Sequence, residues 1–102
     1  MVYARGVVGK FLLVLRWLHD RDPEGFARIE KIQGRGRLYF AKDSQTLESA
    51  GTNVNPKQIP GTPYWVITTT STALKKEILE RVMRELGYAA ADIRAATGAI
   101  DR

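Results

Sequence analysis

The sequence predicts a single domain in which helices from both ends of the chain flank short strands from its middle. The chain has 102 residues, which is the size of one domain. Apolar residues recur at three- and four-residue steps near both ends, whereas the middle holds short aromatic and β-branched runs. Folding of a chain this size buries about 65% of its unfolded surface, so a hydrophobic core is possible.

The N-terminal third predicts two helices. Apolar residues over 7–18 have the spacing of a helix with a wide buried stripe, which Leu13 and Val14 widen further, so we expect this helix at the centre of the core. Asp22 and Pro23 have the pattern of an N-cap and a first helical residue. The short second helix is expected to end at the turn over residues 33–37. Its apolar face consists of Phe26, Ile29 and Ile32.

The middle of the chain predicts the strands. Residues 38–41 are short, aromatic and bounded by turn residues, which favours a strand that begins near Arg37. Residues 51–63 hold three prolines and are expected to be a loop with one edge strand at 57–59. Residues 64–68 give the clearest strand pattern in the chain.

Two further helices are predicted around these strands. Residues 43–50 fit a two-turn helix with Asp43 or Ser44 as its N-cap. Apolar residues over 74–86 mark an amphipathic helix that ends before Gly87, with Thr72 as its expected N-cap.

A last short helix is predicted at the C-terminus. Residues 89–96 form it, and Ile93 is its apolar anchor. Gly98 is expected to lie beyond its end.

Composition excludes several classes of function. The chain has no cysteine and one histidine, which excludes disulfides, thiolate zinc sites and multi-histidine metal sites. No phosphate-loop, dinucleotide or metalloprotease motif occurs, so we expect no cofactor, no metal and no small-molecule substrate. No apolar run reaches the length of a membrane span or a signal peptide, so a cytoplasmic location is expected.

Catalysis is not expected either. His19 stands beside Asp20, but no nucleophile or second acid follows at a useful spacing, and the helix dipole favours a histidine at a helix C-terminus. We therefore expect a binding protein and not an enzyme. The net charge of +5 favours a polyanionic partner or an acidic surface.

Two segments have the chemistry of an anion-binding site. In Gly34-Arg35-Gly36-Arg37, glycine lets a phosphate approach the backbone amides and the arginines can grip successive phosphates; a solvated turn explains the same pattern equally well. The five hydroxyl residues over 68–72 lie between a strand and a helix N-terminus, where amides attract anions. The alternative is a strand end that needs only a helix cap, which accounts for one hydroxyl and not for five.

Basic and aromatic residues near these segments extend the candidate site. Lys57, Lys75 and Lys76 would enlarge a basic face, although ordinary solubilising lysines are the simpler explanation for each. Four aromatic residues can stack on bases or belong to the core, and strand alternation assigns at least half of them to the core. They are Tyr39, Phe40, Tyr64 and Trp65.

Two strings within the chain carry a family resemblance. The string Pro-Lys-Gln-Ile-Pro-Gly-Thr-Pro-Tyr-Trp-Val-Ile-Thr over 56–68, preceded by Gly-Arg-Gly-Arg-Leu-Tyr-Phe-Ala over 34–41, resembles the C-terminal DNA-binding domain of the SeqA family of bacterial replication-sequestration proteins. The resemblance extends over nearly the whole chain. It implies an α+β fold in which helices surround a small three-stranded antiparallel sheet.

The resemblance also implies a function. Members of this family bind hemimethylated GATC in the major groove of double-stranded DNA and negatively regulate the initiation of replication. Their two DNA-binding loops match the two anion-binding segments of this chain. We therefore expect DNA contacts at Arg35, Gly36, Arg37, Thr68, Thr69, Thr70, Ser71, Thr72 and Lys75.

The sequence departs from the family pattern in three places. The family loop reads Thr-Asn-Thr-Asn-Thr, whereas residues 69 and 71 here are Thr and Ser, and the family threonine between the arginines is Gly36. Because asparagine pairs with the N6 and N7 edge of adenine, DNA binding should survive better than methyl and sequence selectivity. The family also carries an N-terminal oligomerisation segment before this domain, so a monomer or weak dimer is expected here. The alternatives are a protein-interaction module, or a less selective DNA or RNA binder that retained the fold.

Overall fold

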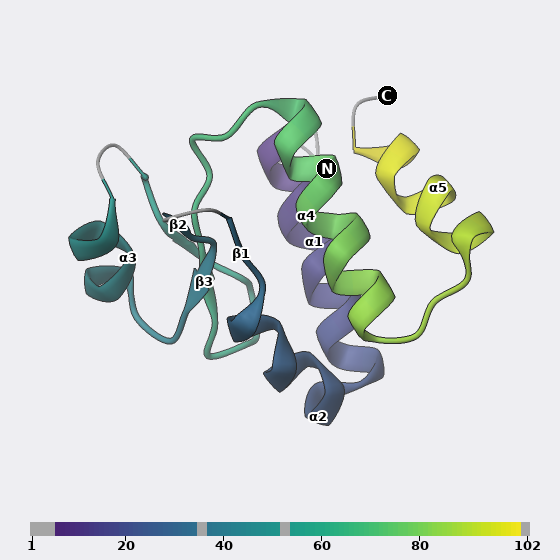
Figure 1. The fold of residues 1–102 in the computed structure, drawn as a ribbon, viewed down its shortest axis with the longest axis horizontal. Coiled ribbons are helices and arrows are strands. Elements are labelled where there is room, and N and C mark those ends of the chain that lie inside the picture. Colours follow the sequence, from purple (N-terminus) through teal and green to yellow (C-terminus); the bar gives the residue numbers. More distant parts are fainter. Residues whose placement is uncertain (1–5, 35–36, 52–53, 101–102) are drawn as a thin grey trace.

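Three helices pack together on one side of the molecule, and a small sheet with one short helix lies on the other (Figure 1). The computed structural model describes residues 6–34, 37–51 and 54–100. The three helices are α1 (Val7–Arg21), α4 (Thr72–Glu85) and α5 (Ala90–Ala99), and the short helix is α3 (Ser44–Ala50). The structure confirms the predicted α+β class, with helices around a three-stranded antiparallel sheet.

Helix α1 supplies the centre of the core, as predicted. Phe11, Leu15 and Leu18 on its buried stripe are fully inaccessible to solvent. The helix continues three residues beyond the predicted end, to Arg21. Leu13 and Val14 were predicted to widen the buried stripe. Val14 is partly buried against the core, but the prediction is wrong for Leu13, whose side chain remains 37% exposed.

The predicted cap between the first two helices is confirmed. Asp22 is the N-cap of α2 (Pro23–Phe26), and its Oδ1 accepts a hydrogen bond of 3.0 Å from the amide of Gly25. Helix α2 passes directly into a 3₁₀ helix, η2 (Ala27–Lys31). The predicted apolar face of this segment is buried in the core: Phe26, Ile29 and Ile32.

The three-stranded sheet has the order β3–β5–β4, with both pairs antiparallel. Its strands are β3 (Phe40–Ala41), β5 (Trp65–Val66) and β4 (Lys57–Gln58). Val66 at the centre faces Phe40 on one side and Lys57 on the other. The predicted edge strand is therefore confirmed as β4, and the strongest strand pattern in the sequence forms the middle of the sheet.

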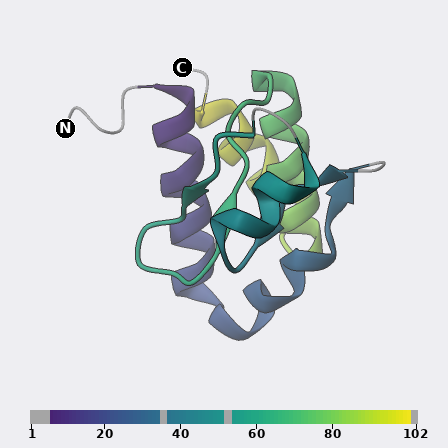
Figure 2. The ribbon, with the colours of Figure 1, turned by 90° about the vertical axis from the view of Figure 1, so that its left-hand side faces the viewer.

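The strand predicted over residues 38–41 is divided between two sheets. Its first part is β2 (Arg37–Leu38), which pairs with β1 (Gln33–Gly34), and its second part is β3. Residues 33–37 were predicted as a turn, yet their first two residues form β1. Glycine has low strand propensity and two residues are too few for a strand pattern, so the pairing with β2 makes this segment a strand. Figure 2 shows this hairpin projecting from the body of the molecule.

The short helices follow their predicted caps more closely than their predicted ends. Asp43 is the N-cap of α3, and its side chain accepts a hydrogen bond of 2.6 Å from the amide of Thr46. This bond lowers the pKa of the Asp43 carboxyl. Helix α5 runs through Gly98, which was expected to lie beyond it. Burial of Ile100 after the last turn holds the helix to the core, and such packing outweighs the low helix propensity of glycine.

Within the described residues, no helix combines the length and the apolar character that a membrane crossing requires.

Substitution of Gly25 by alanine should destabilise the protein by disrupting the α2 cap. A Cβ at this position would lie 2.2 Å from Oδ2 of Asp22, so the capping carboxylate would have to move. We expect the free energy of unfolding to fall by about 1–2 kcal/mol, measured by urea denaturation. Gly98→Ala is the matched control, because its Cβ meets nothing within 4 Å inside α5. The control should gain about 0.5–1 kcal/mol, and equal stability of the two variants would contradict the assigned cap.

Candidate nucleic-acid interface

Sheet topology brings the two predicted anion-binding segments to the same end of the sheet. Because β3 and β5 are antiparallel, the residues before β3 and the residues after β5 leave the sheet at one end. The amide of Ile67, just after β5, donates a hydrogen bond of 3.1 Å to the carbonyl oxygen of Tyr39, just before β3. Strand β4 begins at this end as well, since Lys57 pairs with Val66.

We call this region the loop end of the sheet. Its described part comprises Arg37, Asn55, Lys57 and residues 68–72. In Figure 1, β5 passes at this end into the segment that leads to the start of α4. Arg37 is partly exposed on β2, and Lys57 is exposed on the edge strand, so two cationic side chains lie here. Arg35 and Gly36, which the sequence also predicts to bind DNA, lie outside the described residues.

Thr68 holds the loop end together from inside. It is 5% exposed, and its Oγ1 donates a hydrogen bond of 2.6 Å to the carbonyl oxygen of Asn55. Its amide donates to the carbonyl oxygen of Val54 at 3.0 Å. Asn55 has a positive φ of 41°, a conformation that asparagine adopts more readily than most residues. The Thr68 hydroxyl thus joins the exit of β5 to the segment that precedes β4.

Ser71 caps helix α4. Its Oγ accepts a hydrogen bond of 3.1 Å from the amide of Leu74, and its backbone is extended. The sequence analysis predicted Thr72 as the cap, and this is wrong by one residue. Both hydroxyl residues can cap a helix, so their adjacent positions in the sequence do not distinguish them. Thr72 is instead the first residue of α4 and is partly buried.

Lys75 lies beneath the loop and not on the surface. Lys75 is 3% exposed. Its Nζ donates hydrogen bonds to the carbonyl oxygens of Thr68 at 2.9 Å and Thr70 at 2.5 Å. A third bond of 3.0 Å reaches Oγ1 of Thr70. Burial lowers the pKa of Lys75. A lysine ammonium has three donors, so these bonds account for all of them.

The sequence does contain a signal for the burial of Lys75. It precedes Ile78 by three residues and Leu79 by four, so it lies on the buried stripe of α4. Lys75 was predicted to lie on a basic surface because of its charge, although its helical position indicates burial.

The remaining polar groups of the loop act as hydrogen-bond donors. Oγ1 of Thr70 accepts from the Lys75 ammonium and Oγ of Ser71 accepts from an amide, so each hydroxyl proton is left for another acceptor. The amides of Thr72 and Ala73 precede the first backbone bond of α4, which joins Lys75 to Ser71. Thr69 and Ser71 are exposed. This arrangement suits ligands that carry acceptors, such as phosphate oxygens and the N7 atoms of purines.

The aromatic residues considered for base stacking belong mainly to the core. Tyr39, Phe40 and Tyr64 are between 2% and 6% exposed, and Trp65 is partly buried against the same core. The core interpretation is therefore correct for at least three of the four.

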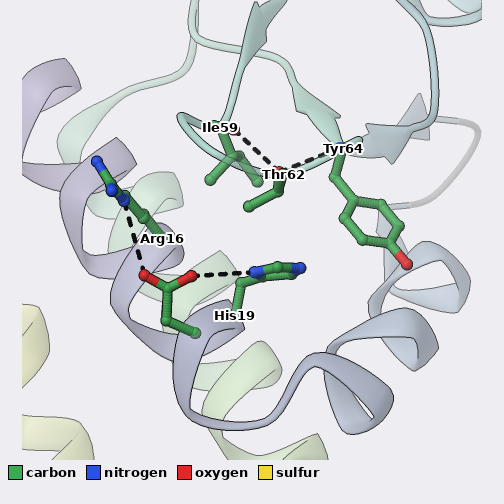
Figure 3. A network of polar contacts seen from close by, with 6 residues as sticks. Arg16, His19, Ile59, Thr62 and Tyr64 are labelled. Carbon is green, nitrogen blue, oxygen red and sulfur yellow. Dashed lines mark hydrogen bonds and ion pairs between the residues drawn. The ribbon is translucent and has the colours of Figure 1, made fainter.

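His19 has the surroundings of a packing residue. Its ring meets the ring of Phe26 edge-on at 5.3 Å, and its Nδ1 lies 3.3 Å from Oδ1 of Asp20. The other Asp20 oxygen lies 3.6 Å from Nε of Arg16. Figure 3 shows Arg16 and His19 of α1 near the turn that Thr62 stabilises. Within the described part of the chain, no cluster of three histidine or acidic residues could hold a metal ion.

An apolar groove on the helical side of the molecule was not predicted from the sequence. It has a volume of about 620 Å³ and lies between α1, α4 and α5. Trp17 on its wall is 49% exposed; its ring lies 4.8 Å from the guanidinium carbon of Arg21 and 6.2 Å from the ring of Tyr88. Trp17 lies four residues after Leu13 and three after Val14, and this helical spacing of a second apolar face was the available signal.

Comparisons with known proteins identify the relatives of this chain. The family model of the SeqA protein C-terminal domain matches residues 2–98. A negative modulator of initiation of replication from Enterobacter sp. strain 638 is 46% identical over 94 residues, which are 91% of this chain and 52% of that protein. The protein of the same name from Idiomarina loihiensis is 44% identical over 88 residues, 86% of this chain and 55% of that protein. The chain thus spans about half the length of these relatives.

A solved structure has the same fold. The crystal structure of V. cholerae SeqA superimposes with a TM-score of 0.84 at 35% sequence identity. The match covers 92% of this chain and 80% of that chain.

Replacement of Ser71 by alanine should destabilise the protein more than replacement of Thr72. Ser71→Ala removes the side-chain acceptor for the Leu74 amide, at a cost of about 1 kcal/mol. Thr72→Ala places a better helix former at the first helical position and should cost nothing. Urea denaturation of both variants measures the difference. A larger loss for Thr72→Ala would contradict the assignment of Ser71 as the cap.

Proposed function

Because this chain belongs to the SeqA family, we propose that it is a non-enzymatic domain that binds double-stranded DNA through the loop end of its sheet. The observation that carries the proposal is the convergence, at one end of the sheet, of Arg37 and Lys57 with a loop whose outward hydroxyl and amide groups are donors. DNA presents acceptors to such a surface along both its phosphate backbone and its major groove. The net charge of +5 favours the same partner.

The residues have different roles in this proposal. Arg35 and Arg37 contact phosphates, and Gly36 lets the backbone between them approach the DNA. Residues 69–72 lie against the groove, with Thr69 and Ser71 nearest the base edges. Thr68 and Lys75 support the loop from within, since their polar atoms are already bonded inside the fold.

The proposed target is hemimethylated GATC, with reduced selectivity. A hydroxyl offers one donor and one acceptor direction, whereas the asparagine of the family loop offers a bidentate pair worth roughly 1–3 kcal/mol of base discrimination. The methyl group of Thr69 can lie against a thymine methyl or the N6-methyl group. Binding in the cytoplasm to such sites would delay the initiation of replication, as the names of the relatives suggest.

A second candidate function is a protein-interaction module that kept the fold. The exposed Trp17 and Leu13 beside the apolar groove are the observations that favour it. This function requires no salt-sensitive binding to DNA, so the following titration separates the two.

The proposal predicts salt-sensitive binding to duplex DNA with a preference for hemimethylated GATC. The chain should be titrated by fluorescence anisotropy against fully methylated, hemimethylated and unmethylated GATC duplexes at two salt concentrations, with single-stranded RNA as competitor. We expect binding to all three duplexes, tightest to the hemimethylated one, and weaker at high salt because phosphate contacts release counterions.

Each other outcome of this titration has one meaning. Equal affinity for the three duplexes would remove the methyl selectivity and leave DNA binding. Displacement by RNA at lower concentration than by DNA would favour an RNA binder. Failure to bind any duplex at low salt would remove DNA binding and favour the protein-interaction module.

Arg37→Ala should weaken binding to all duplexes alike and flatten the salt dependence. Loss of one phosphate contact lowers the slope of log affinity against log salt by about 1. Arg28→Ala is the matched control, because this substitution also removes one positive charge. Arg28 forms an ion pair with Glu85, which lies at the opposite end of α4 from the loop. The control should leave the slope unchanged. A change of sequence preference in Arg37→Ala with an unchanged slope would place Arg37 at a base and not at a phosphate.

A further inference from the structure

The buried ammonium of Lys75 is the most unusual polar feature of the loop end. Lysine is almost never buried unless it is paired, and this residue is 3% exposed. Its described partners are two carbonyl oxygens and one hydroxyl, all from residues 68–70. Burial of a charge beside neutral partners costs free energy that an apolar side chain of the same length would not. The charge therefore calls for an explanation other than the packing of the core.

The bonds of Lys75 determine which way the loop amides point. In a trans peptide the carbonyl and the following N–H point in opposite directions, and the described residues contain no cis peptide. The carbonyls of Thr68 and Thr70 both point inward to Nζ. The amides of Thr69 and Ser71 therefore point away from it, toward the outside of the loop.

The same ammonium also sets the polarity of a hydroxyl. Nζ can only donate, so Oγ1 of Thr70 must accept and its own proton is directed elsewhere. One buried side chain thus orients the Ser71 amide and the Thr70 hydroxyl as donors on the outer side of the loop. Its positive charge lies directly behind them, which further favours an anion at this position.

We propose that Lys75 is the positioning residue of the DNA-binding loop: it holds residues 68–70 in the conformation that presents donors to DNA and does not contact DNA itself. This proposal rests on the proposed function. It assigns to Lys75 a role distinct from that of Arg37, which acts at the phosphates directly. The two roles differ in how a substitution changes the salt dependence of binding.

The test compares Lys75→Met with Lys76→Met in the full chain. Methionine matches the length of the buried stem and has no donor, so the variant should remain folded by circular dichroism while the loop loses its anchor. We expect Lys75→Met to bind hemimethylated duplex about tenfold or more weakly with an unchanged salt slope, because no phosphate contact is lost. Amide NMR signals of residues 68–71 should shift in the free variant, and Lys76→Met should leave these signals in place.

Three results would overturn the proposal. A slope lowered by about 1 in Lys75→Met would mean that Lys75 contacts a phosphate. Unchanged affinity, or unchanged amide signals of residues 68–71, would mean that the loop keeps its conformation without the ammonium. Failure of the unsubstituted chain to bind any duplex would refute the proposed function itself. The titration of the unsubstituted chain is done before the variants are compared, so this outcome is distinguished from failure of the Lys75 proposal.

A second measurement on the unsubstituted chain covers the case in which Lys75→Met does not fold. The protons on Nζ of Lys75 should exchange slowly with water in both the free and the DNA-bound protein, as expected for a buried ammonium that donates hydrogen bonds. Fast exchange in the free protein, or a through-bond coupling from Nζ to DNA phosphorus in the complex, would overturn the proposal.

Discussion

The antiparallel pairing of β3 with β5 is the constraint on which the candidate interface depends. It places the start of β3 beside the end of β5, so the segments that contain Arg37 and Thr68 leave the sheet at the same end, although 31 positions separate these residues in the numbering. Burial of Phe40 and Val66 holds this pair against the helices. A parallel pairing would send the two segments to opposite ends of the sheet, and no redistribution of charge would reunite them.

The interior of the loop end is polar, and its hydrogen bonds replace the packing that apolar side chains provide elsewhere. Thr68 and Lys75 are both buried, and within the described residues no buried side-chain polar atom lacks a partner. Three of these bonds join a side chain to a backbone carbonyl, and the fourth joins the Lys75 ammonium to the Thr70 hydroxyl. A loop held in this way has a defined backbone before any ligand arrives, which lowers the entropic cost of binding.

The sequence predicted best those features that depend on neighbouring residues. The stripe of α1, the caps at Asp22 and Asp43 and the edge strand at Lys57 all have local signals, and each is confirmed. Strand β1 has no such signal, because two residues, one of them glycine, are too short for a strand pattern and become a strand only through their partner. The burial of Lys75 was readable from its position on the α4 stripe, but its bonds to residues 68–70 required the three-dimensional path of the loop.

The anchoring of the loop through its backbone separates two properties that a binding site often combines. Thr68 and Lys75 act on carbonyl groups, which every residue possesses, so the loop conformation does not depend on the side chain at position 69. If the loop binds DNA as proposed, exchange of asparagine for threonine there would change which base edge can be read and would leave the donors that face the phosphates. Affinity for the backbone of DNA and selectivity for its sequence can therefore diverge between members of one family without any change of fold.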